Sequence, residues 1–161
     1  IGYAIQQLNM KTLNNITWEK PNPPPNLSSK YFTHSTESII WAAKTQKSKH
    51  YFNYELMKRM NNGKQMKDVW KMTSPKKSEK AFGKHPTQKP LELLTRIILS
   101  TTKENDLVLD PFNGSGTTGL SCNLNNRKYI GIELKDEFIH LTHRRLAEEV
   151  TNVAIKVPNI K

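Results

Sequence analysis

Hydrophobic and polar residues are patterned most clearly in the last third of the chain. Leucine and isoleucine recur at helical spacing over residues 91–98, and Pro90 suits the first position of that helix. Residues 107–109 are apolar and end at Asp110, which is typical of a buried parallel strand. This alternation predicts an α/β arrangement. Further predicted elements are a helix over 117–125, a strand over 129–133, and an amphipathic helix over 138–150 with Phe138, Leu141 and Leu146 facing inward.

The first two-thirds of the chain carry shorter patterns. Residues 1–10 have the spacing of an amphipathic helix, and residues 16–18 predict a short strand after a turn at Asn14-Asn15. Four prolines in residues 19–26 exclude a helix or a central strand and predict a stiff extended loop. β-branched and aromatic residues predict a buried strand over 38–43. Further on, we expect a helix over 55–60 that stops near 61–63, a strand over 69–72, and no clear element after residue 150.

A glycine-containing segment joins the strand that ends at Asp110 to the helix that follows. Its glycines at 114, 116 and 119 have G-x-G-x-x-G spacing, but Asp110-Pro111-Phe112 stands where a dinucleotide fold brings glycine directly after the strand. A phosphate loop would carry lysine in place of Thr117. Glycine lets the backbone approach a ligand closely, and free N–H groups at a helix start face that ligand. We therefore interpret the segment as a ligand-binding loop, with a purely structural turn as the alternative.

Glu133 ends the next predicted strand, 23 positions after Asp110. In doubly wound folds an acid at this strand tip is placed to bind the two hydroxyls of a ribose. Two acids at neighbouring strand tips, with a glycine loop between them, indicate an adenosine-type ligand. The absence of a phosphate-loop lysine argues against a triphosphate.

The length and composition of the chain limit the class of protein to which it can belong. A chain of 161 residues with 35% hydrophobic content suits one α/β domain or part of one. The helical spacing is already under way at Ile1, so we expect a fragment or the ordered part of a longer protein. The single cysteine, Cys122, excludes an intramolecular disulfide and a cysteine zinc cluster, and we expect no metal. No run of 18 apolar residues and no leader pattern is visible.

The net charge of +11 is concentrated in the middle of the chain. Residues 44–90 carry thirteen Lys or Arg and three Asp or Glu, whereas residues 91–161 are neutral. This block is either a solvated basic surface without a specific partner or a contact surface for nucleic acid. The second interpretation follows because neutralisation of phosphates supplies most of the sequence-independent affinity of proteins for nucleic acid. Low apolar content also predicts that residues 44–84 form an inserted, exposed module, with Trp70 in a small core of its own.

Two motifs carry a family resemblance. The run Asp110-Pro111-Phe112-x-Gly114-Ser115-Gly116-Thr117-Thr118, preceded by His85-Pro86-Thr87-Gln88-Lys89-Pro90, resembles the β class of amino-group DNA methyltransferases, which act with S-adenosylmethionine. Residues 18–26 and 32–37 are similar to the segment between catalysis and recognition in small restriction-modification adenine methylases. The resemblance implies an α/β, Rossmann-like methyltransferase sheet with helices on both faces and a small basic target-recognition insertion. It also implies three parts: a catalytic-side subdomain (1–43), the target-recognition insertion (44–84) and the S-adenosylmethionine-binding subdomain (85–161).

The resemblance also assigns roles to the cofactor residues. The glycine loop would wrap the methionine part of S-adenosylmethionine, Glu133 would hold the ribose, and the 87–89 segment would close the methionine side. The residues implied in cofactor binding are Thr87, Gln88, Lys89, Asp110, Phe112, Gly114, Ser115, Gly116, Thr117 and Glu133.

The catalytic motif of the family is a tetrapeptide of Asp, Asn or Ser, two prolines and an aromatic residue. Its polar groups accept hydrogen bonds from the target amine and its aromatic stacks on the flipped base. Asn22-Pro23-Pro24-Pro25 imitates this motif without the aromatic and lies after the segment that it would have to open. We therefore expect the true motif upstream of Ile1 and assign no catalytic residue. From the basic middle block and the proline loop we expect DNA contacts by Lys20, Asn22, Asn26, Lys30, His34, Lys71, Lys76 and Lys77.

The expected activity is methylation of adenine N6 in a short DNA sequence, in a restriction-modification system of the prokaryotic cytoplasm. Methylation at cytosine C5 would need a cysteine after proline, whereas Cys122 follows Ser121 within a predicted helix and is expected in the core. Cytosine-N4 methylation, a DNA-binding fragment without activity, and RNA methylation are the alternatives. The expected partner is double-stranded DNA, and family members often form homodimers.

Overall fold

The computed structural model describes residues 1–152, with side chains up to residue 147. It forms two compact units, residues 1–74 and 75–161, and each is described by itself. The division at 74/75 differs from the expected boundaries at 43/44 and 84/85, because strand β3 (Val69–Lys71), from the middle segment, pairs with β1 (Lys11–Glu19). Residues 153–161, for which the sequence predicts no element, lie outside the described part.

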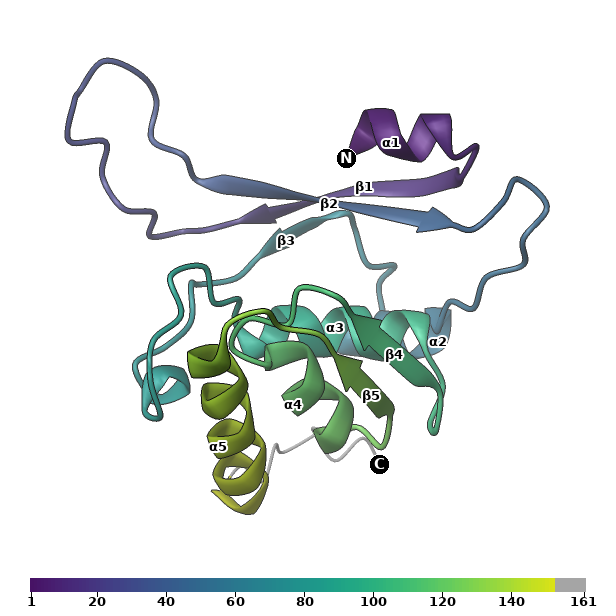
Figure 1. Cartoon of the computed structure of the whole chain (residues 1–161). Coiled ribbons are helices and arrows are strands. Elements are labelled where there is room, and N and C mark those ends of the chain that lie inside the picture. Colours follow the sequence, from purple (N-terminus) through teal and green to yellow (C-terminus); the bar gives the residue numbers. More distant parts are fainter. Residues whose placement is uncertain (153–161) are drawn as a thin grey trace. The chain divides into compact units, whose positions relative to one another are not determined.

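The first unit is built on a three-stranded sheet in the order β2-β1-β3. Strand β1 pairs antiparallel with β2 (Thr36–Ala43) and parallel with β3, and the 20–35 loop that joins β1 to β2 extends away from the strands (Figure 1). The flanking helices are α1 (Gly2–Gln7) and α2 (Tyr54–Met60). The tryptophans at 18 and 70 are buried, and Trp18 Nε1 donates a hydrogen bond to the carbonyl oxygen of Met72 at 2.9 Å. Trp70 is buried, as expected, but it lies on β3 opposite Trp18 of β1 and not in a core of its own.

Two local predictions for this unit are corrected. Asn14 and Asn15 form no turn but lie inside β1, where a register shift between Thr12 and Asn14 marks a bulge. Pairing with an eight-residue partner strand overrides the local turn preference of two asparagines. The strand expected over 38–43 is present, but only Ala43 in it is buried.

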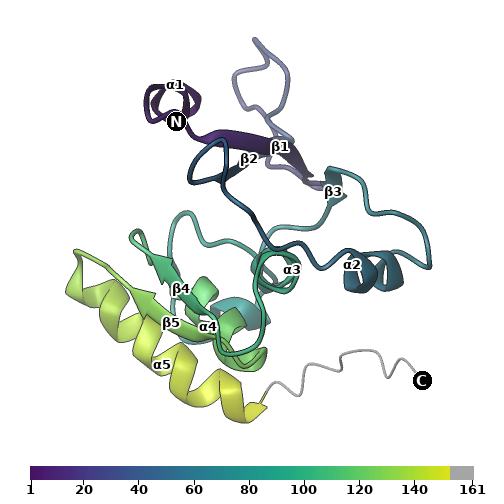
Figure 2. The ribbon, with the colours of Figure 1, turned by 90° about the vertical axis from the view of Figure 1, so that its right-hand side faces the viewer.

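The second unit alternates helices with two parallel strands, β4 (Leu107–Asp110) and β5 (Lys128–Gly131), which lie side by side (Figure 1; Figure 2). The helices are the short η1 (Ser78–Lys80), α3 (Leu91–Thr101), α4 (Thr117–Leu124) and α5 (Asp136–Asn152). Helix α4 connects β4 to β5 and packs against α3, α5 and β5. The core includes Leu93, Ile98, Leu120, Cys122 and Leu141. These elements agree with the order that the sequence predicts for this segment.

Two details differ from the predictions for this unit. Pro90 precedes α3 as its N-cap, and the first helical N–H, that of Leu91, donates to Glu79 Oε2 at 2.8 Å. Leu107 and Leu109 are 61% and 59% exposed, so the prediction of a buried β4 is wrong. Alternate residues of a strand point to opposite faces, and one face of this sheet is left open within the described residues. None of the helices within residues 1–152 has the length and apolar character needed to cross a membrane.

Candidate functional site

The glycine loop of the second unit is braced at its start by Asp110, the last residue of β4. One carboxylate oxygen of Asp110 accepts the N–H of Phe112 at 3.0 Å, and the other accepts the hydroxyl of Thr118 at 2.6 Å. The Thr118 hydroxyl comes from the first turn of α4. Asp110 thus fixes the loop at both ends, which explains why an acid ends this strand.

The middle of the loop is tied to Glu133, which follows β5. The N–H of Gly114 donates to Glu133 Oε2 at 2.8 Å, while the N–H groups of Leu134 and Lys135 donate to Oε1 at 2.9 and 3.0 Å. The hydrogen bonds from the N–H groups of Lys135 and Gly114 lower the pKa of this carboxyl from its ordinary value. Glu133 is therefore ionised at neutral pH. Gly114 of the glycine loop and Glu133, both expected in one nucleoside site, are therefore in direct contact.

His85 brings the second sequence motif to the same place. A Cβ built on Gly114 would lie 3.2 Å from His85 Nε2, and Gly114 has a φ of +54°. The His85 ring is held edge-on to Phe138 of α5, with ring centroids 4.2 Å apart, and its Nδ1 lies 3.2 Å from the backbone nitrogen of Thr87. The expected meeting of the 85–90 motif with the glycine loop is thus seen at His85 and Gly114.

A polar network from α5, which sequence reasoning missed, supports the loop from within the protein. Arg145 is 1% exposed, and its Nη1 donates to the carbonyl oxygen of Ser115 at 2.7 Å and to Thr117 Oγ1 at 2.9 Å. Asn113 donates to Thr142 Oγ1 at 2.8 Å and accepts the hydroxyl of Tyr129. Burial raises the pKa of Tyr129, so that phenol stays a donor. The available signal was position: Arg145 follows Phe138 by seven residues and Leu141 by four, on the inward stripe of α5.

The other residues expected at the cofactor range from buried to fully open. Gln88 is 7% exposed; its amide nitrogen donates to the carbonyl oxygen of Glu79 at 2.7 Å, and its Oε1 has no hydrogen-bond partner within the described residues. Phe112 is 88% exposed, whereas Ser115 and Thr117 are buried with their hydroxyl oxygens 3.2 Å apart. Thr87 is exposed and Lys89 is half-buried. The exposed Phe112 ring and the Gln88 Oε1 without a partner among the described residues are an apolar group and a polar group that a ligand can engage.

The residues expected at DNA are divided between the two units. In the first unit, Lys20 forms an ion pair with Glu37 at 2.5 Å, and Lys71 forms an exposed one with Glu19 at 3.5 Å. Asn26 uses its side chain within the loop, where Nδ2 donates to the carbonyl oxygen of Tyr31 at 2.6 Å. Besides Lys71, the exposed members are Asn22, Lys30 and His34 in the first unit and Lys76 and Lys77 in the second.

Cys122 lies in the core of the second unit, as expected. Its side chain has no exposed surface, and burial raises the pKa of the thiol to about 11. A thiol of this kind stays protonated at neutral pH and is a poor nucleophile. Between residues 1 and 152, no group of three His, Cys, Asp or Glu side chains is arranged to hold a metal ion.

Comparison with known proteins identifies the family. A family model described as DNA methylase (N6_N4_Mtase) matches residues 1–144. The chain belongs to this DNA methylase family. It is 59% identical over 152 residues to the type II methyltransferase M2.LlaDCHI of Lactococcus lactis subsp. cremoris, covering 94% of this chain and 56% of that relative. It is 57% identical over 154 residues to M2.DpnII of Streptococcus pneumoniae, covering 94% and 58%. The chain thus spans less than two thirds of these relatives.

Solved structures support the same family fold. The crystal structure of the M1.HpyAVI–SAM complex has a TM-score of 0.73 and 39% identity, covering 88% of this chain and 65% of that one. The cytosine-N4-specific PvuII methyltransferase has a TM-score of 0.74 at 22% identity, covering 92% and 57%, and shows the fold alone. The expected Rossmann-like α/β methyltransferase fold is confirmed.

Proposed function

We propose that this chain supplies the S-adenosylmethionine-binding and DNA-recognition part of a DNA methyltransferase that acts on adenine N6 in a restriction-modification system. The observation that carries the proposal is the Gly114–Glu133 hydrogen bond at 2.8 Å, with His85 seated over Gly114. It joins the loop, the acid and the 85–90 motif in one site. Support comes from the relatives above, which are named type II methyltransferases. The β class of the family, suggested by the order of the motifs, is part of the proposal.

The residues present fit S-adenosylmethionine. Glu133 would accept hydrogen bonds from the ribose hydroxyls, the unpartnered Oε1 of Gln88 would accept from the ammonium group, and the exposed Phe112 would pack against the methionine part. When bound, the cofactor supplies the methyl group that the target amine accepts. The chain's own part is to bind and orient, because attack by an exocyclic amine on a sulfonium methyl needs no covalent enzyme intermediate. The protonated Cys122 agrees with such chemistry.

Glu133 can serve the ribose while it keeps the loop in place. A carboxylate has about four acceptor positions, and three are taken by the N–H groups of Gly114, Leu134 and Lys135. One ribose hydroxyl can therefore bind without any rearrangement. A second hydroxyl would have to displace one of these three N–H groups.

The DNA part of the proposal rests on charge and on the first unit. Residues 1–74 carry eleven Lys or Arg against four Asp or Glu. The exposed Lys30, Asn22 and His34 of the 20–35 loop are proposed to contact duplex DNA, and Lys76 and Lys77 of the second unit its phosphates. Asn22-Pro23-Pro24-Pro25 lacks the aromatic of the family's catalytic tetrapeptide, so none of these residues is proposed to be catalytic. A homodimer is a proposal from the resemblance alone.

The experiment has two stages. Calorimetry with the chain as given should show S-adenosylmethionine binding that Glu133→Ala weakens by at least tenfold; an unchanged affinity would refute the assigned role. Labelled-methyl transfer to duplex DNA is then assayed with the chain as given and with a form extended upstream of Ile1, and nucleoside analysis of the product separates N6-methyladenine from N4-methylcytosine. Binding of DNA without any transfer would favour the second candidate, a DNA-binding part that lacks activity by itself. A duplex RNA substrate that is methylated instead would support the RNA alternative.

A further inference from the structure

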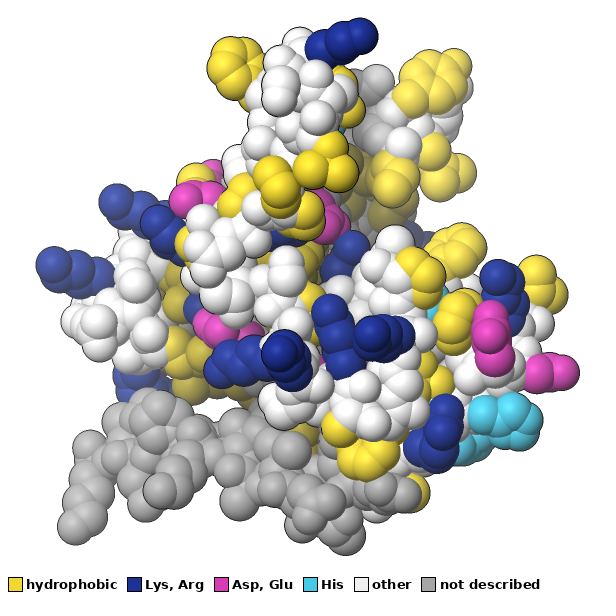
Figure 3. Space-filling model, turned by 90° about the vertical axis from the view of Figure 1, so that its left-hand side faces the viewer, with side chains coloured by type: hydrophobic (Ala, Val, Ile, Leu, Met, Phe, Trp, Pro, Cys, Tyr) yellow, Lys and Arg dark blue, Asp and Glu magenta, His cyan; other side chains and the backbone are white. Residues whose placement is uncertain are grey.

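The 20–35 loop of the first unit holds apolar side chains out in the solvent. Phe32 is 97% exposed, Leu27 is 92% exposed and Tyr31 is 62% exposed. Apolar side chains protrude from this loop at the top of the view in Figure 3. Exposed apolar groups that cluster on one protruding element mark a contact surface rather than scattered surface residues.

The loop backbone is braced, so these side chains are displayed and not merely loose. At its base, the N–H of Lys20 donates to the carbonyl oxygen of Ser35 at 2.7 Å, and the Lys20 ammonium pairs with Glu37. Across its middle, Asn26 donates to the carbonyl oxygen of Tyr31 at 2.6 Å and accepts the N–H of Ser28 at 3.1 Å. Prolines in the segment between these braces fix its φ angles. A preorganised loop loses less entropy when it binds.

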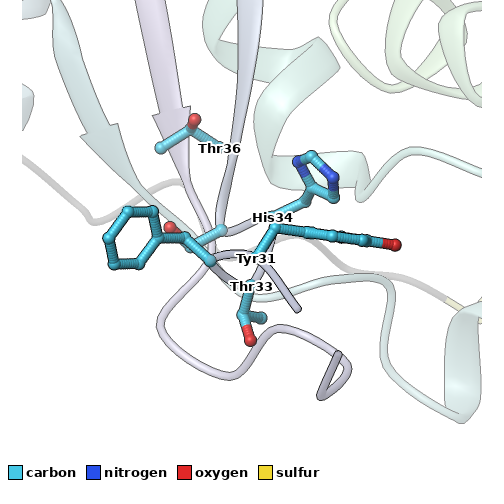
Figure 4. Close-up of a pocket in the computed structure, with 6 residues that line it drawn as sticks. Tyr31, Thr33, His34 and Thr36 are labelled. Carbon is cyan, nitrogen blue, oxygen red and sulfur yellow. The ribbon is translucent and has the colours of Figure 1, made fainter. Parts of the chain in front are cut away.

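The end of the loop that leads into β2, together with the first residue of that strand, forms an open hollow of about 490 Å³ lined by residues 31–36. The rings of Tyr31 and His34 lie on one side of it, with centroids 5.7 Å apart at 48° (Figure 4). Thr33, Ser35 and Thr36 add hydroxyl groups to the lining. Aromatic surface beside hydroxyl groups matches a nucleobase, which has flat apolar faces and a polar edge.

The charge of the 20–35 loop also favours a nucleobase with its phosphate. Residues 20–35 contain two lysines and no acidic residue. Lys30, next to Tyr31 in the sequence, is exposed and forms none of the ion pairs identified in the described part of the chain. A cation beside an aromatic stacking surface is the usual composition of a site that holds a base and its phosphate.

We infer that the 20–35 loop binds one unstacked nucleobase of the DNA in this hollow, in contact with its aromatic lining residues Tyr31, Phe32 and His34 and with Lys30 at a flanking phosphate. The inference rests on the proposed function, since it needs DNA as the partner, and it goes further by naming the groups that hold a displaced base. Enzymes that modify bases must take them out of the stack, and aromatic side chains that hold a displaced base lower the cost of doing so.

The test compares Phe32→Ala and Tyr31→Ala with Tyr3→Ala, a matched control on α1 whose ring is 75% exposed. The probes are a fluorescein-labelled duplex and the same duplex with one central mismatch, bound by the chain as given. Wild type should prefer the mismatched duplex, because its unpaired base costs less to unstack. The loop variants should bind roughly 5- to 100-fold more weakly and lose this preference, whereas Tyr3→Ala should match wild type.

Salt dependence separates stacking from charge. Lys30→Ala should reduce the slope of log affinity against log salt, and Phe32→Ala should leave that slope unchanged. If wild type binds DNA but the Phe32 and Tyr31 variants behave like Tyr3→Ala, the inference fails while the proposed function stands. If wild type binds no DNA, the proposed DNA role itself fails. Displacement of the duplex by an acidic peptide at comparable charge concentration would show a protein-binding loop instead and also overturn the inference.

Discussion

Arg145 Nη1 donates a hydrogen bond to the carbonyl oxygen of Ser115 at 2.7 Å, so helix α5 holds the glycine loop from inside the protein. The same nitrogen donates to Thr117 Oγ1 at 2.9 Å. Because Arg145 is 1% exposed, these bonds form where water competes little. The shape of the loop around a ligand therefore depends on a residue that no ligand need touch.

Arg145→Met should lower both stability and cofactor affinity. The substitution keeps a long apolar side chain but leaves the Ser115 carbonyl and the Thr117 hydroxyl without this donor, at a cost of about 2 kcal/mol in the free energy of unfolding. A loosened loop should also weaken S-adenosylmethionine binding by roughly tenfold. Urea unfolding and calorimetry measure the two effects. The control is Arg144→Met, whose arginine is adjacent and exposed; equal effects from both variants would contradict the assigned role of Arg145.

Glu133 should contribute to stability in a defined pH window. The fold lowers the pKa of this carboxyl, chiefly through the N–H groups of Lys135 and Gly114. Its ionised form therefore stabilises the protein fully above the unfolded pKa of about 4.3. That contribution is lost only as the pH falls through the lower, folded pKa. The stability difference between wild type and Glu133→Gln, from urea melts, should thus be constant from pH 7 to 5 and shrink below pH 4. A difference that shrinks between pH 7 and 5 would contradict this account.

The site elements that could be predicted from the sequence are those set by local chemistry. Three such features can be recognised from a few neighbouring residues: the apolar run that ends in Asp110, the glycines at 114 and 116, and the acid at 133. The two glycines have φ values of +54° and +74°, which other residues rarely adopt. The rule that carboxyl ends of parallel strands meet at one edge predicted that Asp110 and Glu133 end neighbouring strands, and Glu133 accepts the N–H of Gly114 in the loop between them.

The features that could not be predicted depend on contacts between distant segments. The sequence places Arg145 on the inward stripe of α5, but its partners, the Ser115 carbonyl and the Thr117 hydroxyl, depend on how α5 packs against the loop. Asn14 and Asn15 look like a turn until β2 pairs alongside them. Leu107 and Leu109 would be buried only if another layer covered their face of the sheet. The sequence of the strand does not show whether such a layer is present, and within the described residues both side chains are exposed.

Gly116→Ala should destabilise the protein more than Gly63→Ala, although both glycines have similar backbone angles. The φ values are +74° and +77°, so each alanine incurs a left-handed strain of roughly 1 kcal/mol. A Cβ on Gly116 would also lie 2.6 Å from Thr142 Cγ2, whereas nothing lies within 4 Å of a Cβ on Gly63. Thermal melts of the two variants isolate the steric part. Equal losses would mean that Thr142 moves aside and that the loop tolerates the extra methyl group.

In a form of the protein extended upstream of Ile1 to include the catalytic tetrapeptide, Cys122→Ala should leave methyl transfer intact. This tests the choice of an amino group over a ring carbon as the methyl acceptor. Burial raises the pKa of this thiol to about 11, so almost no thiolate exists at pH 8. Iodoacetamide should therefore label the folded protein far more slowly than the urea-unfolded protein. Removing the buried sulfur should cost roughly 1 kcal/mol of stability, seen as a lower urea midpoint. Abolished transfer in a variant that binds S-adenosylmethionine normally would show that Cys122 takes part in the chemistry, and the proposed direct attack by an amine would then be wrong.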